Sequence, residues 1–266
     1  MSSSVLIDRV RLEYPATLPE GEPLVAIADV TLRIDKGEFV AIIGPSGCGK
    51  SSLLFLINGI AAPTSGTVVV AGETVSKPSA QRALVFQDAS LLPWNSVLKN
   101  VAMGLQIQRK PKHDREAQAM GLLRLVGLEG FEAKLPHELS GGMRQRVGIA
   151  RALCVDPDVL LMDEPFGALD AQTRQLMGAE LLRIWLQHRK TVIFVTHDID
   201  EAVFLADRVV VMSARPSRVL EEVSIALPRP RALDIHNTPA FREHRERIWQ
   251  LLQAEVTATW AGLGGT

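Results

Sequence analysis

The sequence predicts an α/β fold, in which a largely parallel β-sheet is covered by helices and carries an N-terminal antiparallel β-subdomain and an inserted helical lobe. Three observations lead to this prediction. Short apolar runs rich in β-branched residues alternate with helical patterns, as in parallel sheets whose strands are joined by helices. Turn-forming residues interrupt the first strand-like pieces, and only helical patterns fill the stretch from 95 to 153.

The N-terminal segment is predicted to be an antiparallel hairpin with a long tip. Strand-like pieces lie within Val5–Ile34, and Pro15, Pro19, Gly21 and Pro23 lie between them. Proline and glycine interrupt strands and favour turns. This hairpin is the predicted antiparallel β-subdomain.

Six apolar runs further along the chain have the composition of buried strands. Each is short and rich in valine, isoleucine or leucine. Helical patterns at Ser51–Ile60 and Ala171–Gln187 follow two of them. The predicted strands are Phe39–Ile43, Thr67–Val70, Ala83–Phe86, Val159–Met162, Thr191–Val195 and Val209–Met212.

The inserted lobe is predicted at about 88–155, as several helices with breaks near Lys110–His113 and Leu135–Pro136. Prolines weaken the pattern after Met212, and a final helix is predicted from Pro239 to about 256. Helices rarely continue through proline, so these breaks are expected to separate elements. The chain is therefore divided into a main domain over 1–230 and a short C-terminal helical extension over 231–266.

The bulk composition is that of a soluble globular protein, with 47% hydrophobic and 22% charged residues among 266. A net charge of −1 gives no overall attraction to nucleic acid. No apolar run approaches the roughly 18 residues of a membrane helix, and no secretory signal is evident. Cys48 and Cys154 are too few for a disulfide framework. We therefore expect a cytoplasmic protein that reaches a membrane only through a partner.

A phosphate-binding loop is predicted at Gly44-Pro45-Ser46-Gly47-Cys48-Gly49-Lys50-Ser51, between a strand and a helix. Its glycines let backbone N–H groups surround a phosphate, and the helix N-terminus adds a favourable dipole. Lys50 is expected to contact the β- and γ-phosphates, and Ser51 to offer its hydroxyl to Mg²⁺. Ser52, the next residue, is also predicted to bind the nucleotide. Cys48 occupies a position that the motif leaves free, so we interpret it as a small filler without chemistry.

Two acids, Asp163 and Glu164, end the predicted strand Val159–Met162. Side chains alternate across a strand, so adjacent acids can serve different atoms. Asp163 is expected to hold Mg²⁺ through water, and Glu164 to polarise the water that attacks the γ-phosphate. The alternative, a pair of solvated acids at a strand end, is common in proteins without such a loop.

Three further residues are candidates for the nucleotide site because of their position in the sequence: Gln87, His197 and Tyr14. Gln87 follows a predicted strand where the core meets the lobe, and its amide can contact both Mg²⁺ and the attacking water. His197 follows the strand Thr191–Val195 and can donate a hydrogen bond to the γ-phosphate. Tyr14, in the hairpin, offers an aromatic face to adenine. The alternative for Tyr14 is a half-buried hairpin residue.

A second anion-binding segment is predicted at Ser140, Gly141 and Gly142, directly before the helical run Met143–Leu153. Small residues at a helix start offer backbone N–H groups and the helix dipole to an anion. A Ser-Gly-Gly turn alone is common, but Leu-Ser-Gly-Gly followed by Gln145-Arg146 is not.

Together these motifs resemble the ATPase subunits of ATP-binding cassette (ABC) transporters. The resemblance runs from Tyr14 to about Met212 in the family's order: aromatic loop, Walker A, Q-loop, Leu-Ser-Gly-Gly signature, Walker B, D-loop at Ala168-Leu169-Asp170, and His197. It implies a P-loop NTPase (RecA-like) core with ATP and Mg²⁺ as cofactors. One departure is Met143, where the commonest signature has glutamine.

The resemblance also implies a head-to-tail homodimer. Each of two ATP molecules is expected between the Walker A loop of one copy and Ser140–Gly142 of the other. Asp170, which is included in the nucleotide-binding set, is expected to cross the interface and help link the two nucleotide sites. The nucleotide site is then completed only by a second copy of the chain.

A finer resemblance is to importers of nitrate, taurine and aliphatic sulfonates. It rests on residues 87–94 and 100–105, on Asp163–Asp170 and on Thr196–Ala202. It implies transmembrane permease subunits, a periplasmic or extracellular solute-binding protein, no nucleic acid, and a peripheral place on the cytoplasmic side of the inner membrane. The apolar Leu91–Trp94 is interpreted as the docking point for a membrane subunit, or alternatively as ordinary lobe core.

Three other functions are alternatives to an ABC importer. An ABC exporter or lipoprotein-release ATPase shares every catalytic motif and is the nearest alternative. A soluble cassette ATPase acting on nucleic acid or ribosomes usually has two cassettes or a long coiled coil, and this chain has one contiguous cassette. A small-molecule kinase explains neither Ser140–Gly142 nor Asp170.

Overall fold

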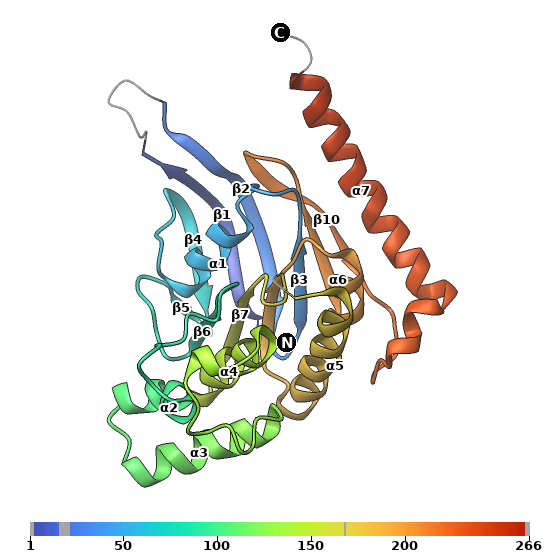
Figure 1. Ribbon diagram of the computed structural model, residues 1–266. Coiled ribbons are helices and arrows are strands. Elements are labelled where there is room, and N and C mark those ends of the chain that lie inside the picture. Colours follow the sequence, from blue (N-terminus) through green and yellow to red (C-terminus); the bar gives the residue numbers. More distant parts are fainter. Residues whose placement is uncertain (1–2, 16–21, 168, 264–266) are drawn as a thin grey trace. The chain divides into compact units, whose positions relative to one another are not determined.

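The computed structural model describes residues 3–15, 22–167 and 169–263 (Figure 1). The chain divides into two compact units: the first holds the residues up to Ser79 and those from Thr191 on, and the second holds Ala80–Lys190. The predicted hairpin tip, with Pro19 and Gly21, lies outside the described residues, as does Ala168. No helix in the described ranges combines the length and apolarity needed to cross a bilayer.

The first unit begins with an antiparallel group of strands. β1 (Ser3–Tyr14) pairs on one side with β2 (Leu24–Asp35) and on the other with β4 (Ser65–Val70), which pairs in turn with β5 (Glu73–Thr74). Alternate residues of β2 are buried, which is the pattern of a strand with one face against a core. The predicted antiparallel hairpin is therefore present.

A parallel group of strands completes the sheet of the first unit. β3 (Phe39–Ile43) lies between β8 (Thr191–Val195) and β9 (Arg208–Met212), parallel to both. All residues of β3 and β8 are buried, as expected for strands covered on both faces. The strand order in this unit is β5-β4-β1-β2-β10-β9-β3-β8.

The strand β10 (Ser217–Ser224) is absent from the sequence prediction. It pairs antiparallel with β9 and, over two residues, parallel with β2. Pro216 precedes it and charged residues interrupt its apolar pattern, so neither composition nor periodicity indicates a strand. Its backbone pairs with the neighbouring strand β9 and with β2, which is distant in sequence, and this pairing outweighs the weak local preference.

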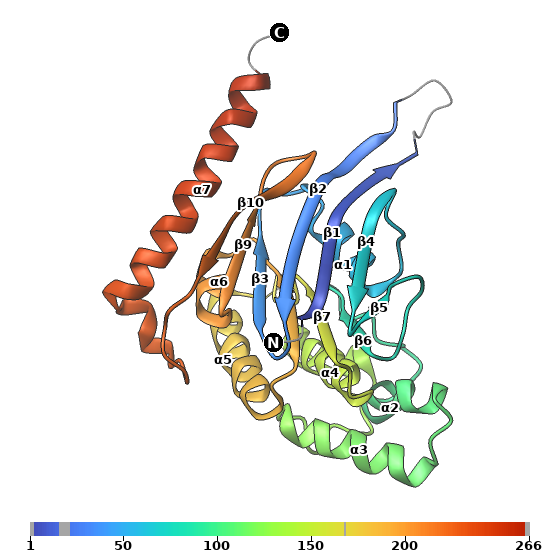
Figure 2. The same ribbon diagram turned by 180° about the vertical axis from the view of Figure 1, so that it is seen from behind.

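The described residues of the first unit form four helical segments. These are α1 (Lys50–Asn58), α6 (Ile199–Leu205), the 3₁₀ segment η2 (Leu233–Asn237) and α7 (Pro239–Leu263). The long α7 runs beside β10 and past α6 (Figures 1 and 2). It starts at the predicted Pro239 and extends beyond the predicted end near 256.

In the second unit, the residues that the structure describes form two parallel strands and a set of helices. β6 (Arg82–Val85) pairs with β7 (Val159–Asp163). The remaining elements are α2 (Val97–Ile107), α3 (Lys112–Leu125), η1 (Pro136–Glu138), α4 (Gly141–Cys154) and α5 (Ala171–His188). Apolar side chains of α2, α3 and α4 share one core, which includes Val101, Leu105, Leu123, Val147 and Ala150. The helices of this core occupy the stretch where the sequence predicts no strand.

Candidate nucleotide-binding site

The predicted phosphate-binding loop joins β3 to α1 in the first unit. A Cβ atom at Gly44 would lie 2.9 Å from the carbonyl oxygen of Met212, so a larger residue is excluded there by backbone. Gly47 and Gly49 have φ of 73° and 104°, a region that side chains disfavour. The sequence therefore forms this tight loop because glycine stands at each of these three positions.

Lys50 places its charge inside the loop. Its Nζ donates to the carbonyl oxygens of Gly44 and Pro45, both at 2.9 Å, and the residue is 6% exposed. No side chain caps the N-terminus of α1, and the first N–H groups of a helix are donors without partners inside the helix. An ammonium group and a helix N-terminus thus meet at one loop, which is an arrangement that binds anions.

Cys48 lies beneath the loop and is 1% exposed. A Cβ atom at Gly44 would lie 3.0 Å from its Sγ, and Lys50 Nζ lies 3.9 Å from it. Burial raises the pKa of the Cys48 thiol, although the Lys50 charge acts in the opposite direction. The thiolate is the reactive form of cysteine, so a buried neutral thiol here has the geometry of a packing residue.

Tyr14 stands at the end of β1, beside α1. Its hydroxyl is hydrogen-bonded to the Ser52 hydroxyl at 3.0 Å, and 37% of the residue is exposed. Ser52 follows Ser51 in the first turn of α1. The structure therefore brings the predicted aromatic residue to the predicted phosphate loop.

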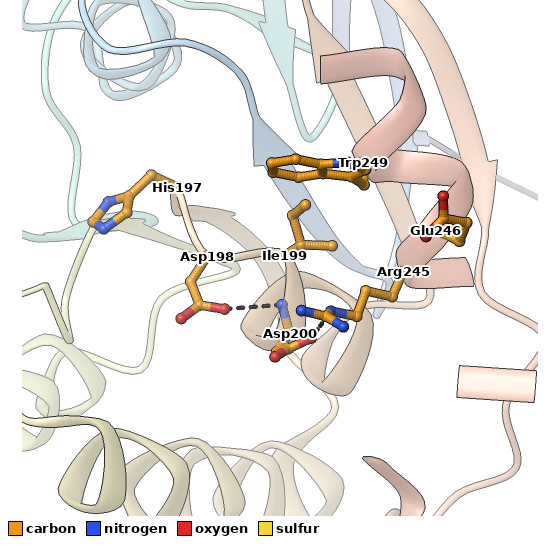
Figure 3. A pocket seen from close by; sticks show the side chains of 7 residues that line it. All are labelled: His197, Asp198, Ile199, Asp200, Arg245, Glu246 and Trp249. Atoms are coloured by element: carbon orange, nitrogen blue, oxygen red, sulfur yellow. Dashed lines mark hydrogen bonds and ion pairs between the residues drawn. The ribbon is translucent and has the colours of Figure 1, made fainter. Parts of the chain in front are cut away.

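His197 lies two residues beyond β8, also in the first unit. The preceding Thr196 is buried, and its hydroxyl donates to a carboxylate oxygen of Glu201 at 2.5 Å. Asp198 caps α6 by accepting hydrogen bonds from the N–H groups of Asp200 and Glu201. His197 itself is exposed and borders a pocket of about 490 Å³ (Figure 3). Its backbone is thus held between a buried strand end and a capped helix.

In the second unit, Gln87 and Glu164 face the same point. A Cβ atom built at Gly167 would lie 3.2 Å from Gln87 Nε2 and 3.6 Å from a carboxylate oxygen of Glu164. Glu164 has a φ of 42°, which is uncommon for a residue with a side chain and clusters at functional sites. Asp163 is the last residue of β7 and is half-buried. The missing side chain of Gly167 leaves the space in which the Gln87 amide and the Glu164 carboxylate come together.

Ser140 and Asp170 both cap helices of the second unit. Ser140 Oγ accepts a hydrogen bond from the Met143 N–H at 3.3 Å, and Gly141 and Gly142 form the first turn of α4. Asp170 accepts from the N–H and the hydroxyl of Thr173, which lowers the pKa of its carboxyl group. Their caps give both residues a structural role within one chain.

Three residues of the site surroundings escape sequence analysis. Ser217 is buried and donates to the Ala26 carbonyl oxygen at 3.1 Å, and a Cβ atom at Gly49 would lie 3.3 Å from its Oγ. Met212 supplies the oxygen that excludes a side chain at Gly44, and Gly167 leaves room for Gln87. No local signal indicates the first two, because their contacts join distant parts of the chain. For Gly167, the only signal in the sequence is its position three residues after Glu164.

The comparisons with known proteins agree with these motifs. The model of the ABC transporter family matches residues 27–167. The taurine import ATP-binding protein TauB of Pseudomonas putida is 45% identical to this chain over 91% of it and 92% of the relative. The chain belongs to the ABC transporter family. The aliphatic sulfonates import ATP-binding protein SsuB of Bacillus cereus is also 45% identical, over 84% of this chain and 87% of the relative.

A solved structure supports the fold of this ABC ATPase. A dimeric ATP-binding cassette bound to ADP and phosphate has a TM-score of 0.74 and 32% identity, and the match covers 84% of this chain and all of that one. The predicted α/β fold with a P-loop NTPase core is therefore confirmed. So is the prediction that the chain is the ATP-hydrolysing subunit of an ABC importer.

Proposed function

We propose that this ABC ATPase powers the uptake of taurine or an aliphatic sulfonate. The observation that carries the proposal is the 45% identity, over most of the chain, to ATP-binding proteins named for import of these solutes. Taurine and the aliphatic sulfonates both carry a sulfonate group on an aliphatic carbon chain. Nitrate, which the sequence resemblance also includes, stays a prediction. Neither relative favours the exporter or lipoprotein-release alternative.

The first unit would bind the nucleotide. The backbone N–H groups of residues 46–49 and the charge of Lys50 would surround the β- and γ-phosphates. A phosphate would compete well for the Lys50 ammonium group, which now donates to loop carbonyl oxygens, because an anion attracts a cation more strongly than a neutral carbonyl oxygen does. Tyr14, next to Ser52, would stack on the adenine.

The residues proposed for Mg²⁺ fit that ion by their chemistry. Ser51, Gln87 and Asp163 offer a hydroxyl, an amide oxygen and a carboxylate, and Mg²⁺ prefers oxygen ligands. Mg²⁺ usually keeps several waters and binds few protein ligands. Bound there, Mg²⁺ would neutralise charge on the phosphates.

Glu164 is proposed as the general base. Its carboxylate would take a proton from the water that attacks the γ-phosphorus, while the bond from that phosphorus to the bridging oxygen of ADP breaks. Gln87, whose amide lies against the same glycine, would orient that water without adding charge. His197 would donate a hydrogen bond to the γ-phosphate.

A second copy of the chain would complete each site. The first turn of α4, at Ser140–Gly142, would present its N–H groups to the γ-phosphate bound by the other copy. Asp170 would cross the interface of this homodimer. The solved relative supports the proposal, since it is a dimer with ADP and phosphate.

The remaining partners are proposed from the names of the relatives and from the exposed lobe surface. Transmembrane permease subunits would dock at Leu91–Trp94, where Trp94 is 73% exposed. Large exposed aromatic residues are enriched at interfaces. The chain would then be peripheral, on the cytoplasmic side of the membrane. A solute-binding protein on the other side would supply the solute, and nucleic acid would have no part.

Uptake measurements in cells test this function. Deleting the gene is expected to abolish uptake of labelled taurine or of a labelled aliphatic sulfonate, and the wild-type gene should restore it. The Glu164→Gln gene should fail to restore it, which separates transport from mere presence of the protein. The wild-type chain should also co-isolate with a multispanning membrane subunit. Unchanged uptake of both solutes, or recovery of the chain on ribosomes, would contradict the proposal.

Replacing Tyr14 tests the adenine contact. Tyr14→Ala is expected to weaken ATP binding about 5-fold or more, because base–aromatic stacking contributes about 1–3 kcal/mol. Tyr14→Phe keeps the ring and removes only the bond to Ser52, so its affinity should stay within about 2-fold of wild type, as expected for one exposed hydrogen bond. Titration with a fluorescent ATP analogue measures both. Equal affinity of Tyr14→Ala and wild type would exclude stacking.

A further inference from the structure

The C-terminal segment of the first unit holds the end of α6 through a buried arginine. Arg231 is 5% exposed, and its Nη1 donates to the carbonyl oxygens of Val203, Phe204 and Ala206 at 2.8–2.9 Å. The last carbonyl groups of a helix have no partners inside the helix and attract positive charge. Burial lowers the pKa of Arg231 to about 10, so the guanidinium stays charged at neutral pH.

Aromatic contacts then attach α7 to the same helix. His236 stacks on Phe204 of α6 with 5.2 Å between ring centroids, and its other neighbour, Phe241 of α7, lies at 4.4 Å. Phe241 and Ile248 are buried on the inner side of α7. Apolar burial of this kind fixes the position of a helix against its neighbour.

The first turn of α6 is held by a further residue of α7. Arg245 Nε lies 2.9 Å from an Asp200 carboxylate oxygen, and Asp200 is in the first turn of α6. Figure 3 shows Trp249, one turn beyond Arg245, above Ile199. These residues wall one pocket together with His197, Asp198 and Glu246. The C-terminal helix thus contacts α6 within three residues of the histidine.

We infer that the C-terminal extension positions His197, and that Arg245 is the residue through which it does so. Arg245 and Asp200 hold the first turn of α6, and Asp198, which caps that turn, follows His197 directly. A small displacement of this turn would therefore move the imidazole. Displacements of about 1 Å in a catalytic arrangement can lower a rate 100-fold. The inference rests on the proposed contact of His197 with the γ-phosphate.

The chain offers a matched control on the same helix. Arg247 pairs with Glu221 of β10 at 2.6 Å and is exposed to a similar extent as Arg245 (side chains 52% and 59%). Its partner lies on a strand and not on α6. Both pairs are solvent-exposed, and such pairs contribute little to stability. Removing either arginine should therefore leave the fold intact, but only Arg245 is linked to His197.

ATPase kinetics of the purified full-length chain test the inference. Arg245→Ala is expected to lower kcat about 3- to 10-fold while KM for ATP changes less than about 2-fold, since the loss acts on the transition state and not on binding. Asp200→Asn, which removes the partner, should reproduce this loss, and Arg245→Lys should recover most of kcat. Arg247→Ala should keep both parameters near wild type. Thermal unfolding of all variants checks that they fold.

Combining Arg245→Ala with His197→Ala separates this inference from the proposed function. Because the arginine acts through the histidine, adding Arg245→Ala to His197→Ala should cause no further loss of kcat. If His197→Ala alone leaves kcat unchanged, the proposed role of His197 fails. If His197→Ala lowers kcat but Arg245→Ala behaves like Arg247→Ala, only the positioning inference fails. The positioning inference would also be overturned if the loss of kcat in the double variant equalled the product of the losses in the two single variants.

Discussion

Glu164→Gln is expected to lower the rate of ATP hydrolysis about 100-fold or more, since a positioned general base contributes about 10²–10⁴ in rate. Glutamine has the same shape as glutamate, so the turn with φ of 42° and the packing against Gly167 should persist. Only the proton acceptor is lost. ATP binding should therefore remain, and the variant should accumulate as an ATP-bound dimer.

Two measurements check this expectation: phosphate release, and the elution volume of the variant with ATP in gel filtration. Glu180→Gln is a suitable control, because Glu180 lies in the same unit and pairs with Arg183 on the surface of α5. That variant should hydrolyse ATP at the wild-type rate. Near-normal hydrolysis by Glu164→Gln would remove Glu164 as the base.

Gly142→Asp is expected to abolish hydrolysis while ATP binding by the monomer changes less than about 2-fold, because a carboxylate at a helix start repels an anion there. The substitution has room, since a Cβ atom at Gly142 would lie 3.5 Å from its nearest neighbour, a Thr173 methyl group. The effect should therefore be electrostatic. It should appear only when a second copy brings this turn to a bound nucleotide.

Gly121→Asp supplies the matched control for this substitution. Gly121 is also helical, lies in the same unit and has no atom within 4 Å of a built Cβ. The control should keep wild-type hydrolysis. Loss of monomer ATP binding in Gly142→Asp, measured by titration at low protein concentration, would indicate that the signature segment serves a nucleotide of its own chain.

Local patterns predict most of the fold of this ABC ATPase. The strands β3 and β8 end at the predicted residues, and α7 begins at the predicted Pro239. Apolar strands buried on both faces carry an unbroken signal in their own residues. β10 carries no such signal, because charged residues interrupt its apolar pattern and its pairing with β2 depends on residues distant in sequence.

The residues of the candidate site also fall into two groups, those that the sequence predicts and those that it does not. The loop around Lys50 and the Ser140 turn are contiguous motifs, so sequence alone locates them. The supports of that loop, Met212 and Ser217, come from the other end of the chain, and no spacing rule points to them. The same is true of the pair between Arg245 and Asp200. Sequence reasoning thus finds the groups proposed to touch the nucleotide more readily than those that position them.

Mixing two inactive variants tests most directly whether two copies share each nucleotide site. Lys50→Ala should fail to hydrolyse ATP because its loop lacks the phosphate-binding charge, and Gly142→Asp should fail for the reason given above. In a mixed dimer, the intact loop of one chain faces the intact signature of the other. Random mixing of a two-fold dimer should then restore up to about a quarter of wild-type activity. If each chain formed its own complete site, the mixture would stay inactive, and that result would contradict the account.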